Sequence, residues 1–89
     1  MFQTSPRRSH AQVISEILSE ASEGANKTRL MYRCNLNFER FNRHLRQLLD
    51  AGVIDRVNPN PKGVTIYKTT DKGRELLTVL RKANKLMAT

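Results

Sequence analysis

The chain has 89 residues, which is enough for one small domain with a limited core. It carries 16 Lys and Arg residues against eight Asp and Glu residues, which gives a net charge of +8 at pH 7. A single cysteine excludes an intramolecular disulfide, and no apolar run reaches the roughly 20 residues that a membrane-spanning helix needs. We therefore expect a cytoplasmic protein with no membrane partner.

The positive charge is concentrated in one part of the chain. Residues 1–26 hold two basic and three acidic side chains, whereas residues 27–89 hold 14 basic and five acidic side chains, a net charge of +9. A basic region of this size favours a polyanionic partner such as a nucleic acid. The alternative is a soluble protein that happens to be basic.

The sequence offers no group of residues for catalysis. It has no Ser/His/Asp arrangement, no paired catalytic carboxylates and no glycine-rich phosphate loop. His10 and His44 lie far apart without cysteine or carboxylate neighbours in a ligand pattern, and Cys34 is typical of a small core residue. We therefore predict that the protein is not an enzyme and has no metal site and no cofactor. No small-molecule ligand can be inferred.

The first predicted helix begins after Ser9. Ser9 and Gln12 match a capping box, in which the serine hydroxyl accepts from the Gln12 amide and the glutamine side chain reaches back. Apolar residues then recur at steps of three and four, and Gly24 is expected to end the helix. The opposite face carries Glu16, Glu20 and Glu23. Because these side chains would repel phosphates, this face should point away from a nucleic acid.

Two further helices are predicted with a tight turn between them. The second helix covers residues 27–34 with Asn26 as its N-cap. Leu36 is an apolar plug in the turn, and Asn37 is expected to cap a third helix that ends at Gly52. The apolar stripe of the third helix consists of Phe38, Phe41, Leu45, Leu48 and Leu49. The opposite side is polar and rich in arginine.

Beyond Gly52 the sequence changes to the alternation of β-strands. Residues 53–57 and 64–69 are rich in β-branched side chains, and the turn cluster "NPNPKG" separates them. Residues around Ala25 and Asn26 are candidates for a short third strand. Thr70 is expected to cap a last helix, whose first apolar side chains should pack on the domain.

This order of elements predicts an α+β, mainly α fold, a winged helix-turn-helix with three helices, a β-hairpin wing and a C-terminal helix. We divide the chain into a flexible basic N-terminal arm (residues 1–8), a winged helix-turn-helix domain (9–70) and a C-terminal helix (71–89). The later apolar side chains of the last helix would lie beyond the domain, which makes this helix a candidate dimerisation element of a homodimer. The expected dimer contacts are Ala83, Leu86 and Met87. A frayed C-terminus is the alternative.

The stretch "KTRLMYRCNLNFERFNRHLRQLLDAGVI" resembles the archaeal winged helix-turn-helix regulators. The matching positions are Lys27, Thr28, Met31, Tyr32, Leu36, Asn37, Phe38, Leu45, Leu48, Gly52 and Ile54. "YKTTDKGRELL" is similar to the family's entry to its final helix, with matches at Tyr67, Thr70, Lys72 and Gly73. The resemblance covers about residues 7–87 and implies a DNA-binding regulator. Some relatives extend the last helix into a long antiparallel coiled coil that joins two subunits, and because this chain ends at Thr89 we expect that a long coiled coil is not available to it.

The polar face of the third helix, residues 37–51, suits the major groove of DNA. An arginine binds guanine through two hydrogen bonds, Asn or Gln binds adenine in the same way, and Glu accepts from cytosine. The predicted DNA contacts on this helix are Asn37, Glu39, Arg40, Asn42, Arg43, Arg46 and Gln47. The alternative is a solvated face that neutralises itself through the i,i+4 pairs Glu39–Arg43 and Arg46–Asp50.

Phosphate contacts are expected from two other places. The start of the second helix offers free amides, together with the side chains of Lys27, Thr28 and Arg29. A capping or packing role is the alternative for Thr28. The wing tip offers Lys62, whereas the asparagines at 58 and 60 are equally typical of turns.

Charge, topology and resemblance together predict a sequence-dependent double-stranded DNA-binding protein that is a transcriptional regulator or a chromatin-associated protein. The alternative is a winged-helix protein–protein interaction module that does not bind DNA. RNA binding is disfavoured because the chain has three Phe and two Tyr and no Trp, and the core needs two or three of these rings. Few rings would then remain for stacking on single strands.

Overall fold

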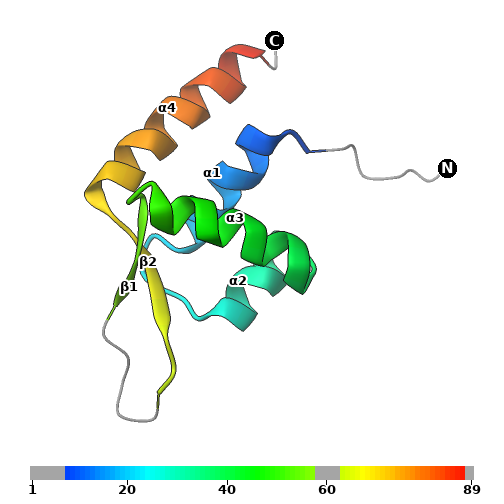
Figure 1. Cartoon of the computed structure of the whole chain (residues 1–89). Coiled ribbons are helices and arrows are strands. Elements are labelled where there is room, and N and C mark those ends of the chain that lie inside the picture. The colour runs from blue at the N-terminus through cyan, green and yellow to red at the C-terminus, as the bar shows by residue number, and fades with distance from the viewer. Residues whose placement is uncertain (1–7, 58–62, 88–89) are drawn as a thin grey trace, which may run out of the picture.

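The computed structural model describes residues 8–57 and 63–87. The elements follow one another as α1 (His10–Glu20), α2 (Lys27–Cys34), α3 (Phe38–Asp50), β1 (Ile54–Val57), β2 (Ile66–Thr69) and α4 (Asp71–Met87), as Figure 1 shows. The predicted fold class is confirmed: three helices form the body, a two-stranded antiparallel hairpin forms the wing, and a fourth helix follows. None of the described helices is long and apolar enough to cross a membrane.

Short-range hydrogen bonds cap the first three helices, and these helices start where the sequence predicts. The Ser9 hydroxyl accepts from the Gln12 amide at 3.1 Å, and the Gln12 side chain accepts from the Ser9 amide at 2.8 Å, which completes the capping box. Asn26 and Asn37 cap α2 and α3, each through a side-chain oxygen that accepts a backbone N–H at 2.8 Å. Each of these helix starts is therefore held by bonds between residues that are three apart in the chain.

The end of α1 was predicted wrongly. The helix ends at Glu20 rather than at Gly24, and residues 21–23 form a turn. The reason is tertiary, because the Ala21 carbonyl accepts from the amide of Thr69 at 3.0 Å as well as from the amide of Gly24. Gly24 then reverses the chain at a φ of +97°.

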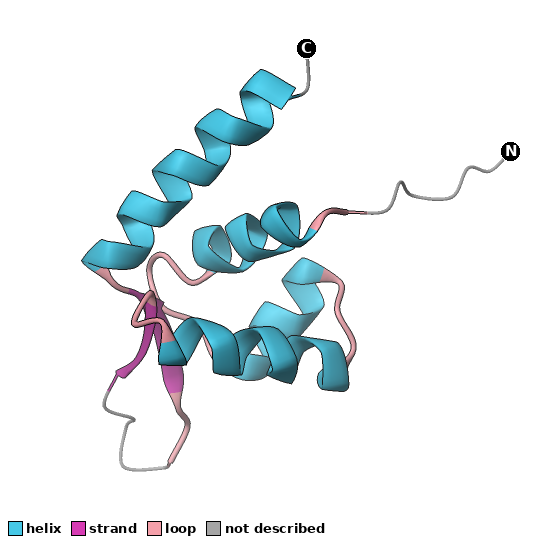
Figure 2. Ribbon diagram, turned by 45° about the horizontal axis from the view of Figure 1, so that its top comes forward, coloured by secondary structure: helices cyan, strands magenta, loops and turns pink. Residues whose placement is uncertain are grey.

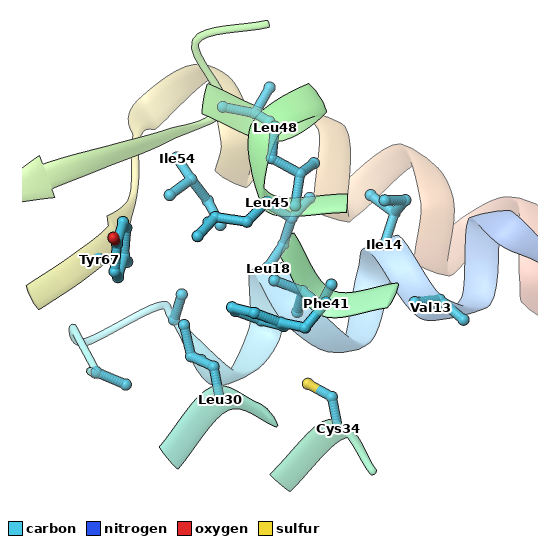
Figure 3. Packing of buried hydrophobic residues seen from close by; sticks show 14 of the residues in the cluster. Val13, Ile14, Leu18, Leu30, Cys34, Phe41, Leu45, Leu48, Ile54 and Tyr67 are labelled. Atoms are coloured by element: carbon cyan, nitrogen blue, oxygen red, sulfur yellow. The ribbon is translucent and has the colours of Figure 1, made fainter. Parts of the chain in front are cut away.

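The core lies where α1, α2 and α3 meet (Figure 3). Phe41 of α3 is fully buried together with Ile17, Leu18 and Leu30. Leu36 is buried in the turn between α2 and α3, which confirms its predicted role as a plug. These contacts hold the two helices of the helix-turn-helix in one fixed orientation on α1.

Cys34 is a core residue, as predicted. Its side chain is buried, and burial, followed by the negative charges of Glu16 and Glu20, raises the pKa of its thiol to about 11. The thiol is therefore protonated at neutral pH and is a poor nucleophile.

Phe38 does not join the core, which corrects the predicted apolar stripe of α3. Its side chain is 61% exposed. Phe38 is the first residue of α3, and Leu36 before it and Phe41 one turn later already occupy the buried positions at this end of the core. Its ring faces solvent, with the Lys27 ammonium 5.5 Å from the ring centroid.

The wing is shorter than predicted and is attached to the body at its root. β1 and β2 pair from Ile54 opposite Thr69 to Val57 opposite Ile66. The candidate third strand is a single bridge, in which Ala25 and Tyr67 exchange backbone hydrogen bonds of 3.0 and 2.8 Å. This bridge joins β2 to the segment between α1 and α2.

Helix α4 starts against the turn that follows α3. Thr70 caps the helix by accepting from the Gly73 amide at 3.0 Å, and its hydroxyl donates to the Gly52 carbonyl at 2.7 Å. Leu77 is buried, and Leu76 and Leu80 pack partly on the core. The second half of α4 extends beyond the rest of the molecule (Figure 2).

The start of α4 packs closely against Val53 and Thr69 because residue 73 is a glycine, and replacing this glycine should destabilise the domain. A Cβ atom at position 73 would lie 2.1 Å from the Val53 carbonyl oxygen and 2.7 Å from a methyl group of Thr69. We expect Gly73→Ala to lower the free energy of unfolding by about 1–3 kcal/mol, measured by urea denaturation, despite the higher helix propensity of alanine. Glu75→Ala, at an exposed position of the same helix, is the control and should change stability by less than about 0.5 kcal/mol. An unchanged or more stable Gly73→Ala would contradict the close packing.

Candidate nucleic-acid interface

The outward face of α3 is a row of exposed polar side chains. Burying Phe41, Leu45 and Leu48 turns the opposite side of the helix to solvent. The exposed residues on that side are Glu39, Arg40, Arg43, Arg46 and Gln47, and Asn42 is half-buried at its edge. The six predicted base-reading side chains that follow the cap therefore lie on one accessible helix.

The arginines of this face are not neutralised by the protein. Neither of the pairs that a self-neutralising face would contain, Glu39–Arg43 and Arg46–Asp50, is present, and the ion pairs of the described residues involve Arg8, Arg33 and Arg74 instead. Three unpaired guanidinium groups within two turns of one helix repel one another, and an anionic partner would relieve that repulsion.

Asn37 has a structural task at the start of α3. Its side-chain oxygen accepts from the Arg40 amide at 2.8 Å, and its carbonyl accepts from the Phe41 amide at 2.9 Å. These bonds hold the first turn of α3. A direct contact of Asn37 with DNA stays a prediction.

The start of α2 presents the side chains that were predicted to contact phosphate. Thr28 and Arg29 are exposed, and Lys27 is half-buried. The cap of this helix is Asn26, and among the described residues the Thr28 hydroxyl forms no hydrogen bond, which argues against the capping role for Thr28.

A concavity of about 270 Å³ lies between α3, the wing root and the start of α2. Three cationic side chains from three elements line it: Lys27 of α2, Arg46 of α3 and Arg56 of β1. The remaining lining residues are Asn42, Leu45, Leu49 and Tyr67. A cluster of this composition suits a phosphate group.

Arg56 was missed by the sequence analysis. It stands two residues after the buried Ile54 in β1, and side chains two apart on a strand share a face. The spacing from Ile54 could therefore have predicted that Arg56 lies on the face toward α3. Only the fold shows that Lys27 and Arg46 lie beside it.

The predicted N-terminal arm and wing tip are only partly covered by the structure. Lys62 and residues 1–7 lie outside the described residues. Arg8, which we assigned to the arm, donates to the Cys34 carbonyl at 2.8 Å and pairs with Glu16. The three-part division of the chain stays a prediction, and Arg8 is anchored to α1 and α2.

Two exposed aromatic side chains flank the turn between α2 and α3. The sequence analysis assigned Phe38 to the apolar stripe of the third helix and gave Tyr32 no role beyond the family resemblance. The Tyr32 side chain is 84% exposed and the Phe38 side chain 61% exposed. Among the described residues, the buried rings are those of Phe41 and Tyr67.

A winged helix-turn-helix family model matches residues 7–88. The chain belongs to the winged helix-turn-helix family. A comparison with curated protein sequences gave no match.

Solved structures share this winged-helix fold. Sso10a-2, a DNA-binding protein from Sulfolobus solfataricus, superposes with a TM-score of 0.80 at 26% identity, over 91% of this chain and 83% of that one. The transcriptional regulator BldR from the same organism gives 0.78 at 19% identity, over 85% of this chain and 56% of that one. The transcriptional repressor CouR, bound to a 23-mer DNA duplex, gives 0.66 at 27% identity, over 85% of this chain and 54% of that one. This winged-helix chain thus spans about half the length of BldR and of CouR.

The environment of His44 predicts that acid lowers the stability of this winged helix. Burial, then the positive charges near it, lower the pKa of His44 below its ordinary value of 6.5; those charges belong to His10, Arg40, Arg43 and Arg8. Its ring lies beside that of His10, with 5.3 Å between the centroids, and its Nδ1 atom is buried and has no hydrogen-bond partner among residues 8–57 and 63–87.

The sign of the pH effect follows from this lowered pKa. At a pH below 6.5 the unfolded chain binds a proton at residue 44 more readily than the folded chain, so the folded state loses stability as the pH falls. We expect the loss of unfolding free energy between about pH 7 and pH 5 to be smaller in His44→Gln than in the wild type, by urea denaturation at both values. An identical loss in both proteins would show that His44 does not contribute to acid sensitivity.

Proposed function

We propose that this protein binds double-stranded DNA in a sequence-dependent way, as a transcriptional regulator or a chromatin-associated protein, with α3 in the major groove. The observation that carries the proposal is the exposed face of α3, whose three arginines have no carboxylate partner among the described residues. The similarity to a DNA-binding protein at 26% identity and to a DNA-bound repressor at 27% identity supports it.

The residue types on α3 match the chemistry of base edges. Arg40, Arg43 and Arg46 can each donate two hydrogen bonds to guanine, and Asn42 and Gln47 can pair with adenine. A solvated helix needs charge for solubility, but it does not need planar groups that donate and accept in pairs. This choice of side chains is what favours base reading over a merely soluble surface.

Phosphate contacts would hold the helix in register. Lys27, Thr28 and Arg29 stand at the start of α2, where the first amides of the helix also favour an anion. Arg56 adds a cation at the wing root. Lys62 remains a proposed contact at the wing tip. Contacts of this kind position a protein on the duplex and carry no sequence information by themselves.

A protein–protein interaction module without DNA binding is the competing function. Such a module should bind a generic duplex weakly even at low salt, whereas the proposed regulator should bind it readily. The family and fold are those of DNA-binding regulators and not of enzymes. We propose a cytoplasmic location, because the resemblance to archaeal regulators implies a cell without a nucleus, whose DNA lies in the cytoplasm.

Arg43 provides the test of base reading. It lies near the middle of the exposed face, so we expect Arg43→Ala to weaken binding to a preferred site, selected from random duplexes, by about 1–3 kcal/mol more than binding to random duplex. Fluorescence anisotropy with both duplexes measures the difference. Lys82→Ala, which removes an exposed cation of α4, is the matched control and should affect both duplexes equally and weakly. Equal losses for Arg43→Ala on both duplexes would make Arg43 a phosphate contact.

We further propose that the protein forms a homodimer through α4. Val79, Ala83 and Leu86 recur at helical spacing on the part of α4 that extends beyond the domain, and Val79, Leu86 and Met87 are 61%, 68% and 84% exposed. An apolar groove of about 290 Å³ lies beside this helix, between α1, α3 and α4. Exposed apolar side chains in one stripe favour a second copy of the helix over solvent.

Sedimentation equilibrium at micromolar concentration tests the dimer. We expect the mass of two chains for the wild type and of one chain for the double variant Val79→Glu/Met87→Glu, because buried carboxylates would oppose association. Thr78→Glu, at an exposed position of the same helix, adds the same kind of charge and should leave the dimer intact. A wild type with the mass of one chain would remove the dimer from the proposal.

A further inference from the structure

We propose that the turn between α2 and α3 binds an unpaired nucleobase of a single-stranded nucleic acid, with the Tyr32 ring as the stacking surface. This site is separate from the base-reading face of α3 and goes beyond duplex binding. The first observation behind it is the exposure of the two rings at this turn, 84% for Tyr32 and 61% for Phe38, in a chain that has only five aromatic residues.

The Tyr32 ring stands beside a concavity of about 380 Å³. Met31 and Leu36, which both pack on the core, give the concavity an apolar floor. Thr28 and Asn35 complete its lining with polar groups. Neither the Thr28 hydroxyl nor the side-chain amide of Asn35 forms a hydrogen bond with a described residue, so each is available to a ligand. An apolar floor, an aromatic wall and free polar edge groups match a flat, aromatic ligand whose rim carries donors and acceptors.

The charge around the turn favours a ligand that also carries phosphates. Arg29 lies one turn before Tyr32 on α2, and the Lys27 ammonium lies 5.5 Å from the centroid of the Phe38 ring. Arg33 is partly neutralised by Glu20 at 3.9 Å, and Glu39 adds one negative charge next to Phe38. The remaining balance is positive, which favours a ligand that carries negative charge, such as a nucleotide chain.

Stacking distinguishes a single strand from a duplex at this site. Within a duplex each base face is covered by its neighbours, so a protein ring can reach only sugars and groove edges. In a single strand the face of a base is open, and stacking on an aromatic side chain is worth about tenfold or more in affinity per base. A pocket built around an exposed ring therefore selects unpaired bases.

The test uses the full chain, a labelled oligodeoxythymidine of about 15 nucleotides, which cannot pair with itself, and a labelled duplex, both followed by fluorescence anisotropy. We expect the wild type to bind the oligonucleotide, Tyr32→Phe to keep this binding because the ring remains, and Tyr32→Leu to weaken it about tenfold or more. Asn35→Gly, which keeps the left-handed backbone at a φ of +54° and removes the amide, should also weaken it. Because the side chain of Tyr32 is exposed, the two Tyr32 variants leave the core intact.

The duplex measurement separates this inference from the proposed function. Duplex binding by Tyr32→Leu should equal that of the wild type. The inference is overturned if the wild type does not bind the oligonucleotide, if Tyr32→Leu binds it as the wild type does, or if Tyr32→Leu weakens oligonucleotide and duplex binding alike. If the wild type bound the oligonucleotide but not the duplex, the proposed function would be contradicted. The oligonucleotide measurements would still decide this inference.

Discussion

The burial of Phe41 against α1 and α2 determines which side of α3 faces outward. Phe41, Leu45 and Leu48 form one narrow buried stripe, so every other position on the helix must face the edge or the solvent. The arginines of α3 are exposed because they lie on the side of the helix opposite this buried stripe. The orientation of the proposed reading face is therefore a consequence of core packing, and a change that rotated α3 by a fraction of a turn would remove the face and open the core together.

The wing depends on a second set of contacts at its root. The Ala25–Tyr67 bridge, the Thr69 amide on the Ala21 carbonyl and the Thr69 hydroxyl on the Leu18 carbonyl join β2 to α1 and to the segment that follows it. These bonds fix β1 through its pairing with β2, and so place Arg56 in the lining of the concavity that Arg46 also lines. The same contacts shorten α1, because the Ala21 carbonyl is turned toward the wing instead of continuing the helix.

The sequence predicts those features of this protein whose causes are local. Ser9, Asn26 and Asn37 bond to backbone groups three residues away, so their patterns identify the helix starts correctly. The exposure of Phe38 could not be read in the same way, because it depends on which of Leu36, Phe38 and Phe41 fills the end of a core built from three helices. Arg56 beside Lys27 and His10 beside His44 are likewise products of chain segments that meet only in the fold. The residues of the proposed site were therefore predictable on α3, where one helix carries them. The prediction was incomplete at the wing root and at the turn, where several elements contribute side chains.

The central claim is that the unpaired cations of α3 meet DNA phosphates and base edges, and the salt dependence of duplex binding tests it most directly. Each phosphate that the protein neutralises should contribute about −0.9 to the slope of log K against log salt concentration. The account predicts a steep negative slope for the wild type and a shallower slope when Arg40, Arg43 and Arg46 are all replaced by Gln, while Lys82→Gln on α4 leaves the slope unchanged. A wild-type slope near zero, or a slope that the triple variant leaves unaltered, would contradict it.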